Sequence, residues 1–146
     1  MLNQLLGERS PDRRQALGTN SGVICRRSNQ CQGTTGHNQI NAHATATHLG
    51  DRYEAEAIHQ VFGCVPVSSL KGHLGHSFAP CGTMESIATL AMLRSGTFWP
   101  TLNCKTPDPE LPKLDYLMDP RSLECPVAMS NSFAMGGFNV ALVLSA

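Results

Sequence analysis

The chain has 146 residues, 41% of them hydrophobic and 15% charged, and its 11 Lys and Arg balance its 11 Asp and Glu. This length suits one domain with one core, and the modest, balanced charge excludes both a highly charged disordered chain and a uniformly basic nucleic-acid binder. The apolar runs are far shorter than the roughly 18 residues that a membrane span needs, and no secretory signal is legible. We therefore expect a cytoplasmic protein without a membrane span.

Six cysteines are scattered singly along the chain. Because no export signal precedes them, free thiols are the expectation. The sequence contains no Cys-x-x-Cys pair, which removes the strongest zinc or redox signature, and it contains neither of the common glycine-rich phosphate-binding motifs. We therefore expect neither a bound metal nor a nucleotide cofactor.

Residues 1–39 differ in character from the rest of the chain. They contain five Arg against one Glu and one Asp, a net charge of +3, whereas residues 40–146 contain six basic and nine acidic side chains, a net charge of −3. Residues 18–39 are rich in Gly, Ser, Thr, Asn and Gln, and only Val23-Ile24-Cys25 could contribute to a core. We expect residues 1–39 to be irregular and disordered, and residues 40–146 to form the organised domain.

The first regular elements follow at residue 40. A short strand is predicted to end within residues 40–43, just before a Thr-rich loop. Asp51 and Glu54 have the spacing of a capping box, and the apolar residues after them recur at helical spacing until Gly63. A strand, a loop and a helix are therefore expected in this order.

The order of strand, loop and helix occurs once more and is then followed by two strands. A strand over residues 65–69 leads through a Gly- and His-rich loop into a helix over residues 80–95. Two strand-like runs, at about 125–131 and 138–144, flank Gly136-Gly137 and predict a closing β-hairpin. The order of elements predicts an α/β fold, with a mixed sheet and flanking helices.

Histidines mark the candidate site. Three of the six, His43, His73 and His76, lie in loops that follow predicted strands. Loops at the carboxyl ends of strands gather functional side chains, so His43 and His76 could face one pocket. Each alone is more often a surface or hydrogen-bonded histidine. His73, His76 and Cys81 are a poor ligand set for structural zinc, because no second cysteine pair accompanies them.

The combination of motifs is more specific than any one of them. Five segments occur in a fixed order: Asn41-Ala42-His43-Ala44-Thr45-Ala46-Thr47, Gly50-Asp51-x-x-Glu54, Ser68-Ser69-Leu70-Lys71 with Gly75-His76, Glu85, and Asn131-Ser132-Phe133-Ala134-Met135-Gly136-Gly137. Together they resemble the C-terminal half of a β-ketoacyl-[acyl carrier protein] synthase, from about residue 40 to residue 144 without a gap. The resemblance implies a thiolase-like fold, here as an incomplete C-terminal half, and an enzyme that works as a homodimer.

The resemblance also implies an activity. Enzymes of this family are acyltransferases that extend fatty-acyl or polyketide chains by decarboxylative Claisen condensation. An acyl group passes from the phosphopantetheine arm of acyl carrier protein to a cysteine, and malonyl-carrier then loses carbon dioxide and attacks the acyl thioester. Acyl carrier protein is thus the implied partner, and no further cofactor is implied.

Four residues match the family's catalytic positions. His43 and His76 match two histidines that donate hydrogen bonds to the enolate oxygen formed by decarboxylation. Lys71 matches a lysine beside the second histidine, whose charge would keep that imidazole neutral. Glu85 matches the buried acidic companion of the lysine.

Other residues match positions that bind substrate. The resemblance implies a pantetheine passage and a turn that closes the acyl pocket, and the matching residues are Thr45, Thr47, Phe133, Met135, Gly136 and Gly137. Ala44 stands where many members have Gly, and Met135 stands where an aromatic gate is usual. A Met gate would be softer, although Met135 could instead be a core filler.

The family's nucleophilic cysteine lies in an N-terminal half that has no counterpart here. Cys25 and Cys31 lack the small-residue turn of that site, and Cys81 is expected to pack at the start of a helix. The first strand and helix of the C-terminal half also have no counterpart in residues 1–39. Two hypotheses follow. In the first, the chain is the histidine-bearing part of a ketosynthase and is active only together with an N-terminal half. In the second, it is an inactive remnant or an interaction module whose sheet lacks its central members.

Overall fold

The computed structural model describes residues 38–146. The expected disorder of residues 1–39 and the interpretation of Cys25 and Cys31 therefore lie outside the described residues, except at the boundary. Asn38 and Gln39 already belong to the first strand, and Gln39 is fully buried. The organised domain therefore includes two residues that were assigned to the irregular segment. Within this part of the chain, no helix has both the length and the apolar character needed to cross a membrane.

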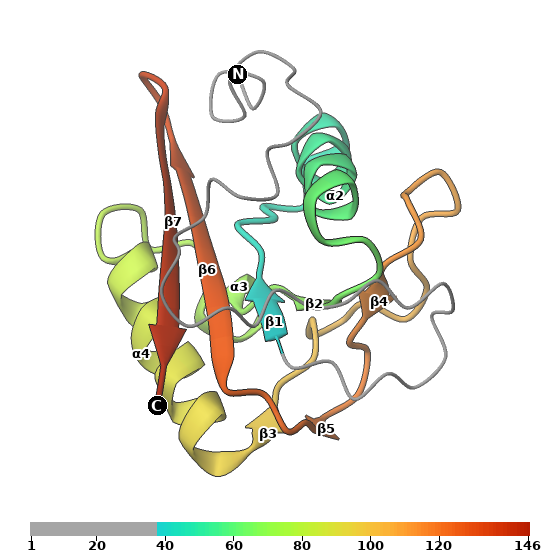
Figure 1. Ribbon diagram of the computed structural model, residues 1–146. Helices are drawn as coiled ribbons and strands as arrows, with labels where there is room; N and C mark the ends of the chain where they lie inside the picture. The colour runs from blue at the N-terminus through green and yellow to red at the C-terminus, as the bar shows by residue number, and fades with distance from the viewer. Residues whose placement is uncertain (1–37) are drawn as a thin grey trace.

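A five-stranded sheet forms the centre of the structure (Figure 1). Its strands, in spatial order, are β4 (Asp115–Tyr116), β2 (Pro66–Ser68), β1 (Asn38–Asn41), β6 (Val127–Ala134) and β7 (Phe138–Ser145). All neighbours pair in parallel except β6 and β7, which form the antiparallel hairpin. These five strands pair without a gap, and the hypothesis that the sheet lacks central members of the family's sheet stays a prediction.

Two long helices cover opposite faces of this sheet. α2 (His48–Phe62) contributes Ala55 and Ile58 to one apolar cluster, and α4 (Cys81–Ser95) contributes Met92 and Leu93 to another. Alternate residues of β6 follow this division, because Met129 packs against the first cluster and Ala128 belongs to the second. The predicted α/β arrangement with flanking helices is confirmed.

Short elements complete the chain. α3 (Lys71–Leu74) lies in the Gly- and His-rich loop between β2 and α4. β3 (Thr97–Phe98) and β5 (Arg121–Ser122) pair as a separate antiparallel ribbon. The predicted helix over 80–95, the strand over 65–69 and the closing hairpin are all confirmed.

The start of α2 differs from the prediction. The helix begins at His48, three residues before Asp51, and Thr47 at its N-cap makes no side-chain capping hydrogen bond. The Asp51-x-x-Glu54 spacing is therefore not a capping box. Glu54 is only 4% exposed and accepts hydrogen bonds from the preceding loop, so burial and a contact outside the helix decide its role.

The cysteines also differ in part from the expectation of free thiols. Cys81, Cys104 and Cys125 are free, but Cys64 is disulfide-bonded. The expectation for Cys64 is therefore wrong. It rested on the inferred compartment, which does not determine which sulfur atoms the fold brings into bonding distance.

Candidate active site

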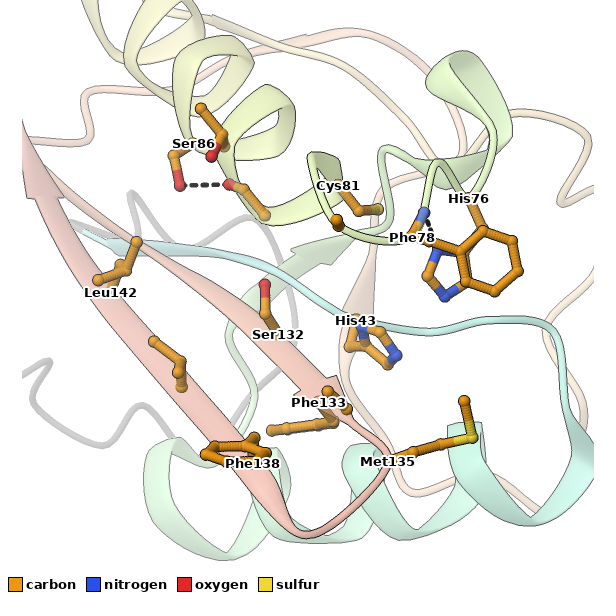
Figure 2. A pocket seen from close by; sticks show the side chains of 15 residues that line it. His43, His76, Phe78, Cys81, Ser86, Ser132, Phe133, Met135, Phe138 and Leu142 are labelled. Atoms are coloured by element: carbon orange, nitrogen blue, oxygen red, sulfur yellow. Dashed lines mark hydrogen bonds between the residues drawn. The ribbon is translucent and has the colours of Figure 1, made fainter.

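His43 and His76 meet at one edge of the sheet. β1 and β2 are parallel neighbours with Asn41 beside Ser68, so the loops that follow them leave the sheet at the same edge. The imidazole centroids lie 5.7 Å apart and the ring planes are at 90°. The expectation that both histidines face one pocket is confirmed, and Figure 2 shows His43 and His76 on adjoining walls of that pocket.

The pocket is an open cavity of about 920 Å³. Its walls come from the loops that carry the two histidines, the first turn of α4 and the β6–β7 hairpin. Phe133 lies on the wall as predicted, with its ring centroid 5.4 Å from that of His43. Met135 lies at the mouth with 91% of its surface exposed, so the core-filler alternative is wrong. The site therefore combines two imidazoles with a mainly apolar enclosure.

The environment of His43 keeps its imidazole neutral. Burial is the largest of three causes that lower the pKa of His43 to about 4, and the other two are the positive charge of Lys71 and the proximity of His76. A neutral ring has one N–H donor and one acceptor nitrogen. Lys71, which the resemblance places beside the second histidine, thus contributes to the lowered pKa of the first.

Lys71 and Glu85 form a buried ion pair behind the histidines. The Lys71 Nζ donates to Glu85 Oε1 at 2.6 Å, and the two side chains are 7% and 1% exposed. The same Oε1 also accepts a hydrogen bond from Cys81 Sγ at 3.5 Å, whereas Glu85 Oε2 is buried without a partner among the described residues. The structure thus places Glu85 as the buried companion of Lys71, with neither side chain on the cavity wall.

Glu54 holds the backbone of the His43 loop. Its carboxylate accepts from the backbone N–H of His43 at 2.9 Å and of Ala44 at 2.8 Å, and from Asn131 Nδ2 at 3.0 Å. Burial raises the pKa of Glu54, and these donors oppose that rise because they stabilise the carboxylate. The sequence pattern assigned Glu54 to a helix cap and to a family motif, but not to this contact with the His43 loop.

Two further polar residues join the ends of the strands. Asn41 is fully buried; its Oδ1 accepts from Leu70 N–H at 3.1 Å and its Nδ2 donates to Ser130 Oγ at 3.0 Å. Ser69 Oγ donates to the Ala44 carbonyl at 3.2 Å. These bonds fix the two histidine loops relative to each other and to β6.

The remaining predicted residues lie near this cavity but do not line it. Thr45 and Thr47 lie in the loop before α2, where their hydroxyls are 3.3 Å apart. Gly136 and Gly137 form the hairpin turn with φ of 86° and 84°, a backbone region that favours glycine. The role of these four residues in substrate binding stays a prediction.

His73 does not line the cavity that holds His43 and His76. Its Nε2 lies 2.9 Å from the Pro100 carbonyl oxygen, and its ring packs near Trp99. Within residues 38–146, no group of three or more His, Cys, Asp or Glu side chains is arranged to hold a metal ion. His73 therefore has a structural contact instead of a place in the cavity.

Comparisons with known sequences agree with these motifs. Residues 33–105 match a family model described as the β-ketoacyl synthase C-terminal domain. The chain is 37% identical over 113 residues to the chloroplastic 3-oxoacyl-[acyl-carrier-protein] synthase II of Arabidopsis thaliana, and 36% identical over 107 residues to 3-oxoacyl-[acyl-carrier-protein] synthase 1 of Escherichia coli strain K12. These alignments cover 74% and 72% of this chain, but 21% and 26% of those relatives. The chain thus spans about a quarter of the length of the curated relatives it matches.

Solved structures give the same result. The fold is similar to a β-ketoacyl synthase from Burkholderia phymatum STM815, with a TM-score of 0.71 and 38% identity over 73% of this chain and 27% of the other. It is also similar to AntDE:AntF, a type II ketosynthase in complex with its acyl-carrier protein, with a TM-score of 0.70 and 32% identity over 77% of this chain and 28% of the other. The predicted thiolase-like fold class is therefore confirmed.

Proposed function

The chain belongs to the β-ketoacyl synthase family, of which it carries a C-terminal domain, and from this membership we propose that it supplies the histidine-bearing part of a β-ketoacyl-[acyl carrier protein] synthase. The reaction is decarboxylative Claisen condensation of malonyl-carrier with an acyl thioester, in fatty acid or polyketide biosynthesis. The observation that carries the proposal is the pair formed by His43 and His76, whose rings lie 5.7 Å apart on the wall of an apolar cavity.

The two imidazoles stabilise the enolate that decarboxylation produces. Loss of carbon dioxide breaks the bond between the malonyl carboxylate and C2, and the electron pair moves onto the thioester oxygen. His43, whose ring is neutral, and His76 donate ring N–H groups to that oxygen, a preorganised stabilisation that is worth several kcal/mol when water is excluded. The lowered pKa of His43, about 4, supports this role because the ring keeps a defined donor nitrogen at neutral pH.

Glu54 and Lys71 act through the histidines and are positioning residues. Glu54 fixes the backbone at His43 by two hydrogen bonds of 2.9 and 2.8 Å. Burial lowers the pKa of His43 most, the positive charge of Lys71 adds to that effect, and Glu85 holds Lys71 in place. Such support matters because oxyanion donors must stay within about 0.5 Å of productive geometry.

The cavity wall suits an acyl chain, and the loop beyond it suits the carrier arm. Phe133 and Met135 border the histidines, and Gly136-Gly137 let the hairpin turn approach closely. The hydroxyls of Thr45 and Thr47 are available to hydrogen-bond the amides of a phosphopantetheine arm. Acyl carrier protein is the proposed partner, and the description of AntDE:AntF as a carrier-bound ketosynthase supports this choice.

Condensation also needs the family's nucleophilic cysteine, which lies in the N-terminal half. We therefore expect the active assembly to contain this chain together with a Cys-bearing N-terminal ketosynthase half, or a homodimer built from both. The test is co-expression of the two polypeptides, followed by an assay with acyl- and malonyl-carrier protein. β-Ketoacyl product should form with the pair and disappear on His43→Ala. The isolated chain should form no product and should decarboxylate malonyl-carrier no faster than buffer.

An interaction module without catalysis is the second candidate. It is favoured by β7, an edge strand on which Val140, Leu142 and Val143 are exposed. Exposed apolar side chains on an edge strand favour pairing with another chain. In the same experiment, a stable complex that makes no β-ketoacyl product would support the interaction module over the synthase.

A further inference from the structure

We propose that Cys81 is an acyl acceptor, whose thiol takes an acyl group from a thioester and holds it inside the cavity shared with His43 and His76. The inference rests on the proposed function in one respect, since that function makes acyl thioesters the substrate class. The sequence had suggested only that Cys81 packs at the start of a helix.

The first argument is location. Cys81 is the first residue of α4 and is a free thiol, 6% exposed, on the wall of the cavity of about 920 Å³. Figure 2 shows it beside Phe78 and His76, above Ser132 and His43. The other two free thiols in the described part of the chain, Cys104 and Cys125, do not line this cavity.

The second argument is a proton acceptor. Cys81 Sγ donates a hydrogen bond to Glu85 Oε1 at 3.5 Å, and Lys71 Nζ donates to the same oxygen at 2.6 Å. Glu85 is 1% exposed, and its Oε2 is buried without a partner among residues 38–146. A buried carboxylate directed at the thiol, with one oxygen still unpaired, can take the thiol proton. The Lys71 ammonium group next to Glu85 then compensates the negative charge that the Cys81 sulfur carries.

The third argument is a place for the oxyanion. The first backbone N–H groups of an α-helix have no acceptor within the helix. In α4, Pro80 at the N-cap offers no side-chain hydrogen bond, and Met84 N–H is the group that bonds back to the Pro80 carbonyl. Gly82 and Thr83 lie between them and line the cavity. Their N–H groups can donate to a thioester oxygen that becomes negatively charged beside Cys81.

The reaction is a thioester exchange that needs no further reactant. Glu85 takes the proton from the Cys81 thiol while Sγ attacks the carbonyl carbon of the incoming thioester. The tetrahedral intermediate collapses with cleavage of the bond to the pantetheine sulfur. That sulfur leaves as a thiolate and takes the proton from Glu85. The acyl group then extends along the apolar wall formed by Ala134, Phe138, Val140 and Leu142.

The test uses the full chain alone with octanoyl-CoA, followed by intact mass measurement and peptide mapping. We expect one octanoyl group, labile to hydroxylamine, on the peptide that contains Cys81. Cys81→Ala and the closely isosteric Cys81→Ser should both remove this label, whereas the matched control Cys104→Ser should retain it. Absence of the label, an equal distribution over several cysteines, or a label that persists in both Cys81 variants would overturn the proposal.

Glu85→Gln tests the proton acceptor separately. General-base catalysis contributes about 10²- to 10⁴-fold, so acylation at neutral pH should slow by about 100-fold in this variant. The rate should recover at alkaline pH, where a thiol ionises without a base, and an unfolded variant would not show that recovery. Equal rates for the two proteins at every pH would overturn the role of Glu85.

The failure of this proposal can be distinguished from the failure of the proposed function. If the co-expressed pair condenses substrates but the isolated chain is not labelled at Cys81, the acyl-acceptor proposal alone fails. If Cys81 is labelled but the pair makes no β-ketoacyl product, the proposed function alone fails.

Discussion

Lys71 Nζ and Glu85 Oε1 lie 2.6 Å apart and join the start of α3 to α4, so that the loop carrying His76 is closed by a buried ion pair. The two side chains are 7% and 1% exposed. Removing one partner of such a pair leaves an uncompensated buried charge, which is far more costly than losing a surface pair. The stability of this loop therefore depends on both residues together.

Lys71→Met should lower the free energy of unfolding by about 3–5 kcal/mol, because Glu85 then keeps a buried charge without its partner. Urea denaturation measures the loss. The double variant Lys71→Met with Glu85→Leu should recover much of it. Arg52→Met, which breaks an exposed pair with Glu56, is the matched control and should change the value by about 0–1 kcal/mol. If Lys71→Met and Arg52→Met lost the same free energy of unfolding, the buried-pair argument would be contradicted.

Glu54→Gln should displace His43, because a carboxamide replaces one acceptor oxygen by an NH₂ group that faces donors. We expect a loss of about 1–3 kcal/mol in the free energy of unfolding. In the co-expressed pair, kcat should fall more than KM rises, since the enolate donors lose their alignment. Glu56→Gln, on the same helix and exposed to solvent, is the control. An unchanged kcat in Glu54→Gln would show that the His43 loop is held by other contacts.

Stability should depend on pH through His43. Its pKa in the folded chain is about 4, below the ordinary value of 6.5, so the unfolded chain binds the proton first as the pH falls. Stability therefore does not depend on His43 above about pH 6.5 and decreases as the pH falls from 6.5 towards 4. Urea titrations at stepped pH should show this slope, and His43→Gln should flatten it in that window. An identical slope in the variant would mean that other groups cause it.

The edge strand β7 should cause the isolated chain to self-associate. It has eight residues, Phe138–Ser145, without charge or proline, and one edge of it is unpaired in the described sheet. Charged side chains are a common means of blocking such edges. Val143→Lys should therefore raise the concentration at which light scattering detects association. Leu49→Lys on α2 is the control, because Leu49 is 62% exposed and Val143 69%. Equal effects would point to general solubility instead of strand pairing.

Local sequence patterns were sufficient for α4 and for the closing hairpin of β6 and β7. Gly96 ends α4 in a left-handed conformation, and β6 and β7 stand on either side of the Gly136-Gly137 turn, as the spacing of the two strand-like runs predicts. The convergence of His43 and His76 was also predictable, because both follow parallel strands. These features depend on residues that are near each other in sequence or on a general property of parallel sheets.

Long-range contacts account for the differences. Glu54 bonds to Asn131, 77 residues later, and no local pattern contains that distance. The effect of Lys71 on His43 likewise depends on the positions of two loops, and the disulfide at Cys64 depends on a sulfur partner that spacing does not identify. Burial also determines the role of a side chain. Glu54 has the spacing of a helix cap, but it is buried and bonds to the His43 loop.

The pairing of β1 with β6 has a consequence for how the chain folds. Asn38 pairs with Val127 and Asn41 with Ser130, so the first described strand acquires its second neighbour only from the far end of the chain. Contacts of such high sequence separation form late and slow the folding of a domain, because the closure entropy of the long loop must be overcome first. During synthesis, β1, α2, β2 and α4 emerge before the strand that supplies Asn131 and Phe133. The cavity is therefore completed at the end of folding, and partly folded chains expose the apolar surfaces around β1 until that moment.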